Sequence, residues 1–347
     1  MDKNDFWLIL PSSGYEIFKY FMKRAVFVVF IVFYCVLSSE AQQDRQFSSG
    51  FFNQVTQNPA FVGATNKWNV GGVLREQWSS LDGSPSTSVF SFDMPFRVLN
   101  THHGFGISFI SDKLGANLKQ STTSVAISYS YKYKLLGGVL SIGARAAYIN
   151  YSLDGKGNLA SGTTWNNNKK LLEGTEGTEA YDELVGVVDY SGGLLYKKDS
   201  WYVGLSVNHL LEPNLFSKSV DGDNARTIEI DYNRNFYMTG GYAFDVSPSF
   251  ILTPTIHAIS DLSSYQFTGG VRSLINNVFW LGVAYRQDDA ILLNTGIQFK
   301  GGMKFGYSYD YGISEFSRTS NGSHELMVVY SFDVKAKRQK MSSVRFL

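Results

Sequence analysis

Aromatic side chains recur at every second position in many short stretches of this chain. Between Lys304 and Tyr311 they alternate with Lys304, Gly306, Ser308 and Asp310. A period of two places the aromatic groups on one face of a β-strand and the small or polar groups on the other. The pattern repeats from Trp68 to Phe332 with nothing helical between. It is typical of an outer-membrane β-barrel, which turns an apolar belt to lipid and a polar face to the lumen.

About fourteen strands can be counted, an even number as bacterial barrels require. The first seven are predicted at 68–77, 86–94, 102–113, 120–134, 138–153, 187–197 and 201–209. The others are predicted at 235–245, 250–258, 264–273, 278–286, 290–300, 303–311 and 324–332. The expected fold is therefore all-β, a transmembrane antiparallel outer-membrane barrel of about fourteen strands.

The connections between these strands alternate between short and long. Short turns are predicted at 135–137, 198–199, 246–249 and 301–302. Long loops are predicted at 154–186, 210–234 and 312–323. The long loops occupy odd-numbered connections, as expected when both termini are periplasmic and the longer loops face outward.

Alternation within a strand assigns its two faces. Val125, Ile127 and Tyr129 are expected to face lipid, while Ser128 and Ser130 face the lumen. Tyr and Trp near strand ends suit the aromatic girdles at the membrane interfaces. A barrel of this size has an interior wider than side chains alone fill, so it needs a plug, a ligand or water.

The single long apolar run lies near the N-terminus. Lys23 and Arg24 precede an apolar stretch, and a small-x-small pattern ends at Ala41, as in a cleaved secretory signal peptide. Residues 1–41 are therefore expected to be removed. Met22 is an alternative start, because residues 1–21 resemble no ordinary signal n-region. The only cysteine, Cys35, lies inside this signal, so the mature chain would have no thiol for a disulfide, a metal site or catalysis.

Two segments flank the predicted barrel at 67–334. The polar segment 42–66 is expected to form either a periplasmic arm or an inward-folded plug. The tail 335–347 carries five Lys and Arg residues and is expected in the periplasm, either simply solvated or facing partners. The whole chain has 31 Lys and Arg against 30 Asp and Glu, which gives no indication of nucleic-acid binding.

Four ordered motifs resemble the PorP/SprF family of the type IX secretion system of Gram-negative bacteria. The first is Gln46-Phe47-Ser48 followed by Asn58-Pro59-Ala60-Phe61-Val62-Gly63. The second runs from Arg75 through Trp78 and Asp82-Gly83 to Thr87. The third and fourth are 306–314 and 322–328, which are similar to a closing hairpin of that family. Ser84 and Ser86 and the two longest loops depart mildly from the family pattern.

This resemblance implies a barrel that assists export or surface attachment of large proteins, including gliding-motility adhesins. It also implies contact with other type IX components in the periplasm and outer membrane, and with a secreted protein or its C-terminal signal. Outer-membrane lipid is the remaining partner. From composition alone, a channel for small or hydrophobic molecules and a purely structural barrel stay open as alternatives.

No motif indicates an enzyme, a metal site or a cofactor. His102 and His103 are neighbours on a strand and point to opposite faces, so they are expected in a solvated turn. The acidic stretch 221–224 lacks the spacing of a calcium loop and is interpreted as a polar turn. No Ser lies in a G-x-S-x-G elbow, and no phosphate-binding loop is present.

The candidate contact residues come from the family motifs. In the first group, Asp82-Gly83 is also an ordinary turn signal, but turn geometry does not account for Arg75 and Trp78. The second group lies in the closing hairpin, where a buried charge must find partners. A rim or luminal hydrogen-bond contact and a purely structural role stay open there. That group comprises Tyr309, Asp310, His324 and Glu325.

Overall fold

The computed structural model divides the chain into two units, Met1–Ala41 and Gln42–Leu347. It describes residues 44–50, 53–115, 118–156, 180–221, 224–315 and 317–333. The first unit, the proposed signal peptide, and the basic tail 335–347 lie outside the described residues. No helix among the described residues is long and apolar enough to cross a membrane.

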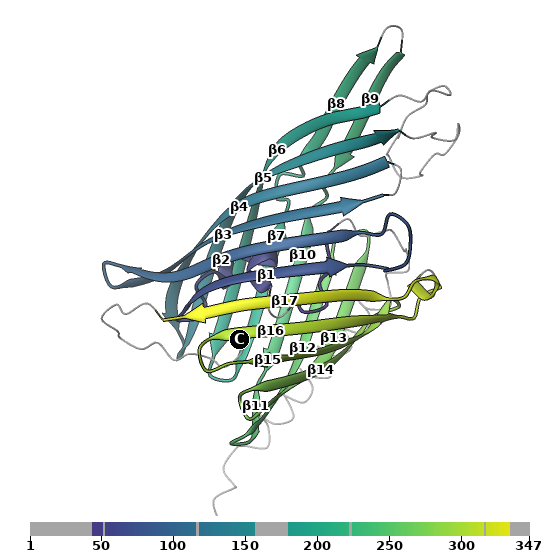
Figure 1. Ribbon diagram of the computed structural model, residues 1–347. Helices are drawn as coiled ribbons and strands as arrows, with labels where there is room; N and C mark the ends of the chain where they lie inside the picture. The colour runs from purple at the N-terminus through teal and green to yellow at the C-terminus, as the bar shows by residue number, and fades with distance from the viewer. Residues whose placement is uncertain are drawn as a thin grey trace, which may run out of the picture. The chain divides into compact units, whose positions relative to one another are not determined.

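The described part of the second unit is a closed antiparallel barrel (Figure 1). Its first half comprises β1 (Trp68–Glu76), β2 (Ser86–Val98), β3 (Thr101–Leu114), β4 (Leu118–Leu135), β5 (Gly138–Lys156), β6 (Ala180–Lys198) and β7 (Trp201–Asn208). Its second half comprises β10 (Asn235–Tyr242), β11 (Phe244–Ser247), β12 (Phe250–Ser260), β13 (Tyr265–Ile275), β14 (Phe279–Arg286), β15 (Ala290–Gln298), β16 (Met303–Gly312) and β17 (Ser323–Phe332).

Two ladders complete the ring. β1 pairs with β17 from Trp68↔Phe332 to Glu76↔His324, and β10 pairs with β12. The short β11 continues β10, because it pairs with β12 directly after it. The sheet of 15 strands is thus a barrel of fourteen, since β10 and β11 form one wall strand. The predicted fold class and strand number are confirmed.

The two faces of the strands follow the predicted alternation. On β4, Val125 and Ile127 are 47% and 56% exposed, whereas Ala126, Ser128 and Ser130 are at most 4% exposed. The exposed side chains form the outer, lipid-facing surface, and the buried ones line the interior. Apolar side chains also fill part of that interior: Trp280 packs with Val73, Val89 and Met327.

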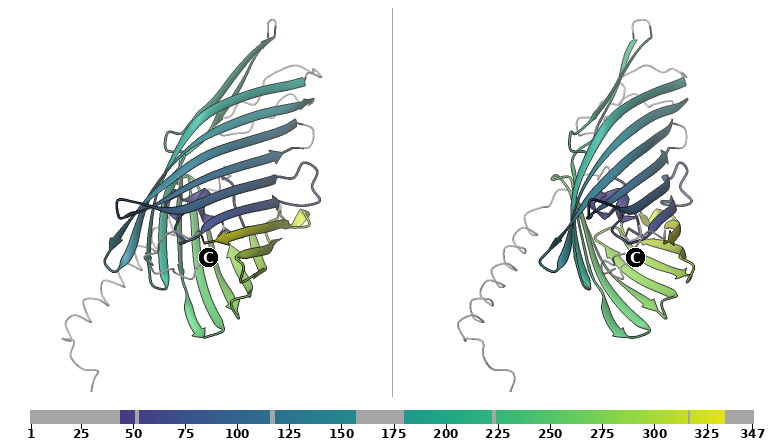
Figure 2. Two further views of the ribbon diagram at one scale, coloured as in Figure 1. Left: turned by 60° about the vertical axis from the view of Figure 1, so that its left-hand side comes forward. Right: turned by 90° about the vertical axis from the view of Figure 1, so that its left-hand side faces the viewer.

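The barrel has two unlike ends. One end, called the turn end, carries tight turns such as 99–100, 136–137 and 199–200. The other, called the loop end, carries the connections 77–85, 209–234 and 313–322. The last of these contains the one-turn helix η2 (Ser317–Thr319). Figure 2 shows the long strands β4–β6 extending well beyond the shorter strands of the second half at the loop end.

Three local expectations were wrong. β5 and β6 reach Lys156 and Ala180, so the predicted loop 154–186 is shorter than expected. The predicted loop 210–234 contains a hairpin, β8 (Asn214–Asp221) with β9 (Asn224–Asp231). His103 lies within β3 and stacks on Phe96, because the turn is formed by Leu99 and Asn100 in the left-handed conformation.

Candidate functional site: the luminal segment and its charge network

The described residues 44–50 and 53–66, here called the luminal segment, lie in the interior of the barrel. Their short helical turns α2 (Gln54–Gln57) and η1 (Pro59–Phe61) lie within the ring of strands (Figure 2). Asp44 contacts His209 at the loop end, and Gly63 contacts Asp93 toward the turn end. The segment therefore passes from the loop end to the turn end, where it enters β1.

The stretch Asn58–Gly63 rests on glycines of the wall. An added Cβ on Gly143 would lie 2.3 Å from the Ala60 nitrogen, and one on Gly193 would lie 2.1 Å from Asn58 Oδ1. A Cβ on Gly104 would lie 2.0 Å from the carbonyl oxygen of Val62. Any side chain at these three positions would overlap the segment. The glycines thus form a seat for the N-P-A-F-V-G motif on β3, β5 and β6.

Side chains of the wall bind the carbonyl groups of the same stretch. Ser141 donates to the Ala60 carbonyl at 2.8 Å, and Ser130 donates to the Val62 carbonyl at 2.8 Å. The Arg145 guanidinium donates to the carbonyls of Val55 and Thr56. Buried carbonyls need such partners because an unpaired one costs about 1–3 kcal/mol. The wall therefore supplies the hydrogen bonds that a helix or sheet would otherwise give this segment.

Asn58 is the most highly bonded side chain of the motif. Its Nδ2 donates to the carbonyls of Leu194 and Leu205, each at 3.1 Å, and its Oδ1 accepts from the Ala60 N–H at 2.9 Å. The two carbonyls belong to β6 and β7, so one amide ties the segment to two neighbouring strands. The same oxygen caps the first turn of η1.

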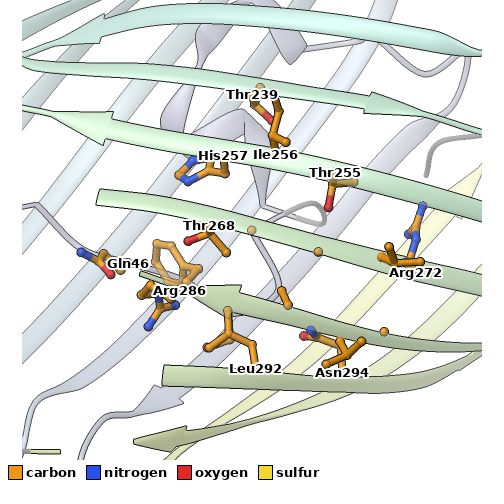
Figure 3. A pocket seen from close by; sticks show the side chains of 18 of the residues that line it. Gln46, Thr239, Thr255, Ile256, His257, Thr268, Arg272, Arg286, Leu292 and Asn294 are labelled. Carbon is orange, nitrogen blue, oxygen red and sulfur yellow. The ribbon is translucent and has the colours of Figure 1, made fainter. Parts of the chain in front are cut away.

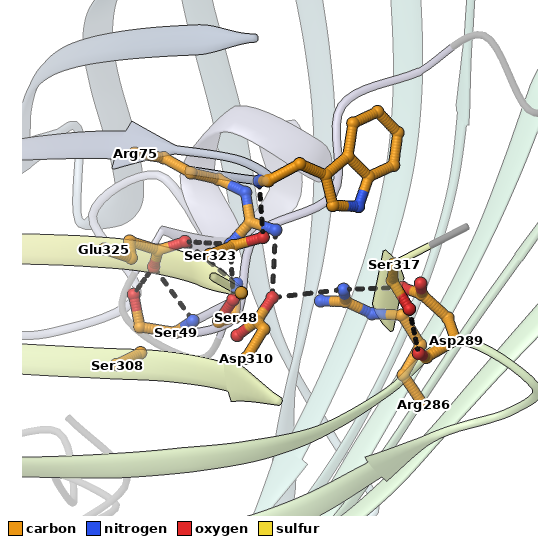
Figure 4. Close-up of polar contacts among 12 residues, drawn as sticks. Ser48, Ser49, Arg75, Arg286, Asp289, Ser308, Asp310, Ser317, Ser323 and Glu325 are labelled. Carbon is orange, nitrogen blue, oxygen red and sulfur yellow. Dashed lines mark hydrogen bonds and ion pairs between the residues drawn. The ribbon is translucent and has the colours of Figure 1, made fainter. Parts of the chain in front are cut away.

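A buried charge network holds the loop-end half of the segment (Figure 4). Arg75 Nη2 lies 2.9 Å from Asp310 Oδ2, and its Nη1 lies 3.2 Å from Glu325 Oε2. The Glu325 carboxylate also accepts from the N–H groups of Ser48 and Ser49, each at 2.9 Å. Arg75, Asp310 and Glu325 are all at most 4% exposed. The carboxylate is thus shared between the wall and the luminal segment.

Arg286 extends this network to a fourth strand. Its Nη1 lies 3.3 Å from Asp310 Oδ2 and 3.1 Å from Asp289 Oδ2. Asp310 is therefore held between two guanidinium groups, Arg75 and Arg286. Paired charges of this kind are costly to separate, because each one left alone would be buried without a counter-charge.

A second charged contact lies at the start of the luminal segment. Asp44 Oδ2 is 3.8 Å from His209 Nε2, and His209 Nδ1 is 3.0 Å from Asp189 Oδ2. Burial lowers the pKa of His209, but the hydrogen bond with Asp189 and the charges of both carboxylates outweigh it and raise the pKa above its usual value. Burial raises the pKa of Asp44, but His209, Tyr237 and Arg45 outweigh it and lower the pKa. Both shifts favour the charged form of the group concerned.

The predicted contact residues fall into two groups. Arg75, Asp310 and Glu325 meet in the lumen, as described above. Tyr309 and His324 lie beside them in sequence but point the other way, and their rings are 5.2 Å apart. The Tyr307 hydroxyl is 2.7 Å from His324 Nδ1. The closing hairpin therefore has a charged luminal face and an aromatic outer face.

The other predicted residues lie in the 77–85 connection. The Trp78 N–H donates to Ser323 Oγ at 3.1 Å, which joins this connection to the start of β17. Asp82 is exposed, and Gly83 has a φ of 76° that favours glycine. Gly83 also accepts a backbone hydrogen bond from Gly115. These residues lie at the loop end, separate from the buried network.

Sequence reasoning missed the glycine seat and the Arg145, His209 and Arg286 contacts. Gly104, Gly143 and Gly193 did carry a signal, because a glycine inside a strand often marks a close backbone approach. The partner in that approach is more than 40 residues away in sequence for each, so no local pattern identifies it. His209 gave no signal, since its partners Asp44 and Asp189 belong to distant segments.

Comparison with known proteins identifies the family. A model of the "Type IX secretion system membrane protein PorP/SprF" family matches residues 39–330. No protein with a curated description matches the sequence. Among solved structures, the translocator domain of the autotransporter NalP from Neisseria meningitidis is similar, with a TM-score of 0.50 and 11% identity over 81% of this chain and 93% of that chain.

The toluene transporter TbuX from Ralstonia pickettii has a TM-score of 0.49 and 10% identity, over 83% of this chain and 94% of that chain. The likeness to NalP concerns the barrel fold alone, and nothing is inferred from the likeness to TbuX. The family match covers most of the described barrel and all four motifs found in the sequence. The chain belongs to the PorP/SprF family of type IX secretion system membrane proteins.

Proposed function

We propose that this protein is a non-enzymatic component of type IX secretion that assists export or surface attachment of large cell-surface proteins. Gliding-motility adhesins are the cargo class that we favour. The family match supports a role in this secretion system. One structural observation carries the finer proposal: the luminal segment is bonded to the wall at both ends of the barrel. Because the luminal segment occupies the interior, the two rims of the barrel are the surfaces that partners would contact.

The loop end is the proposed docking surface for an exported protein or its C-terminal signal. Trp78, Asp82 and Gly83 lie there, on the connection that is joined to β17. The β8–β9 hairpin and the long strands β4–β6 extend the same end. We assign the turn end and the basic tail 335–347 to other type IX components in the periplasm.

The proposal is tested by quantitative proteomics of surface and medium fractions from a strain lacking this gene and from its parent. We expect selective loss of one or a few large secreted proteins. An unchanged secretome would contradict the proposal. Deletion of 335–347 tests whether the tail binds periplasmic components. Unchanged co-purification of these components would show that the tail has no part in that contact.

A channel for small molecules is the second candidate function. A cavity of about 70 Å³ beside the luminal segment favours it. Removal of residues 42–66 should then raise single-channel conductance in planar bilayers, and the intact protein should show uptake of a specific solute. A secretion defect without any conductance or uptake would favour the first proposal.

A further inference from the structure

Two cavities of the lumen differ in the charges that surround them. The larger lies between the luminal segment and strands β12–β15 (Figure 3), and its Arg286 guanidinium is already paired with Asp289 and Asp310. The smaller has a volume of about 30 Å³ and lies at the turn end, where the luminal segment meets β4, β5 and β6. Its lining includes two lysines, Lys132 and Lys197.

The luminal segment brings the two ammonium groups together. Lys132 Nζ donates to the Val62 carbonyl at 3.1 Å, and Lys197 Nζ donates to the Ala64 carbonyl at 3.3 Å. These carbonyls are two positions apart, and two residues of chain span at most about 7 Å. The ammonium groups are close enough for the charge of Lys197 to act on Lys132. Each has three N–H groups and uses one of them on the described residues, so both keep donors for a shared ligand.

The strand register places both lysines on the inner face of the wall. Lys132 of β4 lies opposite Ser141 of β5, and Lys197 of β6 lies opposite Val139 of β5. The two side chains therefore approach each other over β5, from its two neighbouring strands. Gly63 leaves room for the Lys132 ammonium beside the segment, since an added Cβ there would lie 2.9 Å from Nζ. The cavity is thus lined by an ammonium group from either side.

The positive charge at this place exceeds the negative charge. The charge of Asp93 acts on Lys132, but its carboxylate accepts from the Gly63 N–H at 2.8 Å and from the Asn69 amide at 3.2 Å. Within the described ranges, neither Lys132 nor Lys197 forms an ion pair. One acid is therefore set against two ammonium groups. A buried charge without a counter-charge is costly, so the pair of lysines is complementary to one further anionic group.

The cavity can be reached from the turn end. Its lining includes Gly137 and Asp199, which are both exposed and belong to the tight turns of that end. Lys198 also lines the rim, so the charges of Lys198 and Asp199 offset each other there. A group that enters from this end would pass the rim and meet the two inner lysines.

We propose that this cavity binds a carboxylate group of a periplasmic polypeptide, between Lys132 and Lys197. A water-sized group needs about 10–15 Å³ of such space, so about 30 Å³ admits about two, as many as the oxygens of one carboxylate. A phosphate, with four oxygens, needs about twice that space. The rest of the ligand stays outside, as it does when the acid is an Asp or Glu side chain of a protein at the turn end. The assignment to the periplasm rests on the proposed function.

The first test measures binding to the purified full-length protein in detergent by ligand-observed NMR. The probe is the peptide acetyl-Gly-Gly-Glu-Gly-Gly-amide, and the same peptide with Gln in place of Glu is the neutral reference. Ionic strength is held constant with sodium chloride. We expect the Glu peptide to bind at least tenfold more tightly than the Gln peptide. Equal binding of the two peptides would overturn the proposal, whereas the proteomic test of the proposed function does not depend on this result.

A second test identifies the source of the carboxylate. A water-soluble carbodiimide joins a carboxylate to a lysine amine in contact with it, and mass spectrometry of treated outer membranes locates the amide. We expect a link from Lys132 or Lys197 to an Asp or Glu of another protein. Binding of sodium acetate to the purified protein without any such link would assign the site to a free small acid and overturn the polypeptide ligand.

Lys197→Gln locates the site, because the amide can still donate to the Ala64 carbonyl but carries no charge. We expect at least a tenfold loss of affinity for the Glu peptide, about the contribution of one hydrogen bond to a charged group. Lys304→Gln is the matched control: it makes the same change in a lysine of β16 that is 9% exposed and lies outside the cavity lining. It should bind like the parent.

Equal binding by Lys197→Gln and the parent would also overturn the assignment. Heat-modifiable migration in gel electrophoresis shows whether each variant forms a barrel. If Lys197→Gln does not fold, Lys132→Gln takes its place with the same expected loss. Unaltered binding by Lys132→Gln would then contradict the site.

Discussion

Arg75 Nη2 and Asp310 Oδ2 lie 2.9 Å apart, although 235 positions separate the two residues in sequence. Their strands, β1 and β16, are not neighbours, because β17 lies between them. The ion pair therefore reaches across Glu325 of β17, which is bonded to Arg75 as well. The network links the first strand of the barrel to the last two and includes the luminal segment.

Replacing Arg75 tests how much this network stabilises the barrel. Arg75→Met leaves the charges of Asp310 and Glu325 buried, and removal of one partner from a buried pair costs about 3–5 kcal/mol. The free energy of unfolding in denaturant should fall by that amount. Arg234→Ala is the control, since its ion pair with Glu212 is about half exposed and should contribute about 0–1 kcal/mol. Equal losses for both variants would contradict a special role for the network.

The glycine seat predicts a leaky variant. Gly143→Ala places a Cβ 2.3 Å from the Ala60 nitrogen, so the luminal segment must shift from the wall. Overpacking of this kind costs about 1–3 kcal/mol. Single-channel conductance in planar bilayers should rise. Gly72→Ala is the control, because its added Cβ meets nothing closer than 3.6 Å. If Gly143→Ala still folds into a barrel but its conductance does not rise, the glycine seat does not close the lumen.

The Asp44–His209 contact predicts a dependence on pH. The raised pKa of His209 gives stability that is complete below about pH 6.5 and lost as pH rises through the folded-state pKa. The lowered pKa of Asp44 gives stability that is lost as pH falls through its own folded-state pKa. The protection of the amides at 44–50, taken as the intrinsic exchange rate at each pH divided by the observed rate, should therefore fall at alkaline pH.

His209→Gln should remove the fall in protection above about pH 6.5. His103→Gln is the control, because His103 stacks on Phe96 and bonds Tyr129, and makes no contact with the luminal segment in the described residues. A pH profile that is the same in His209→Gln and the parent would remove His209 from the explanation.

The loop-end docking surface predicts a secretion defect without loss of folding. Asp82→Asn changes an exposed charge on the 77–85 connection, so stability should change by about 0.5 kcal/mol or less. The amount of exported cargo at the cell surface should fall. Equal surface cargo in Asp82→Asn and the parent would remove Asp82 from the docking surface.

The wall of the barrel could be predicted because lipid and lumen impose a strict alternation on each strand. Val125 and Ser128 were assigned to the correct faces from this period alone. The strand ends beyond the membrane were less well predicted, since both faces meet water there. This is why β5 and β6 were expected to be shorter, and why the β8–β9 hairpin was interpreted as a loop.

Residues of the site could be predicted only where they belong to one of the four sequence motifs. Arg75, Asp310 and Glu325 were selected from motifs at opposite ends of the sequence, and the structure places them in contact. Arg286 was not selected, because a single arginine at the end of a strand resembles any rim charge. Its role depends on the register that brings β14 and β16 to either side of β15.

The luminal segment continues directly into β1, the strand that pairs with β17 to close the ring. A pull on the segment from the loop end would therefore load that seam. It would first break the contact of Asp44 with His209, and then those of Ser48 and Ser49 with Glu325, which itself belongs to the seam. The nine residue pairs between β1 and β17 would then carry the force along their length. The segment is thus a tether, and the ladder between the first and the last strand of the barrel bears the tension on it.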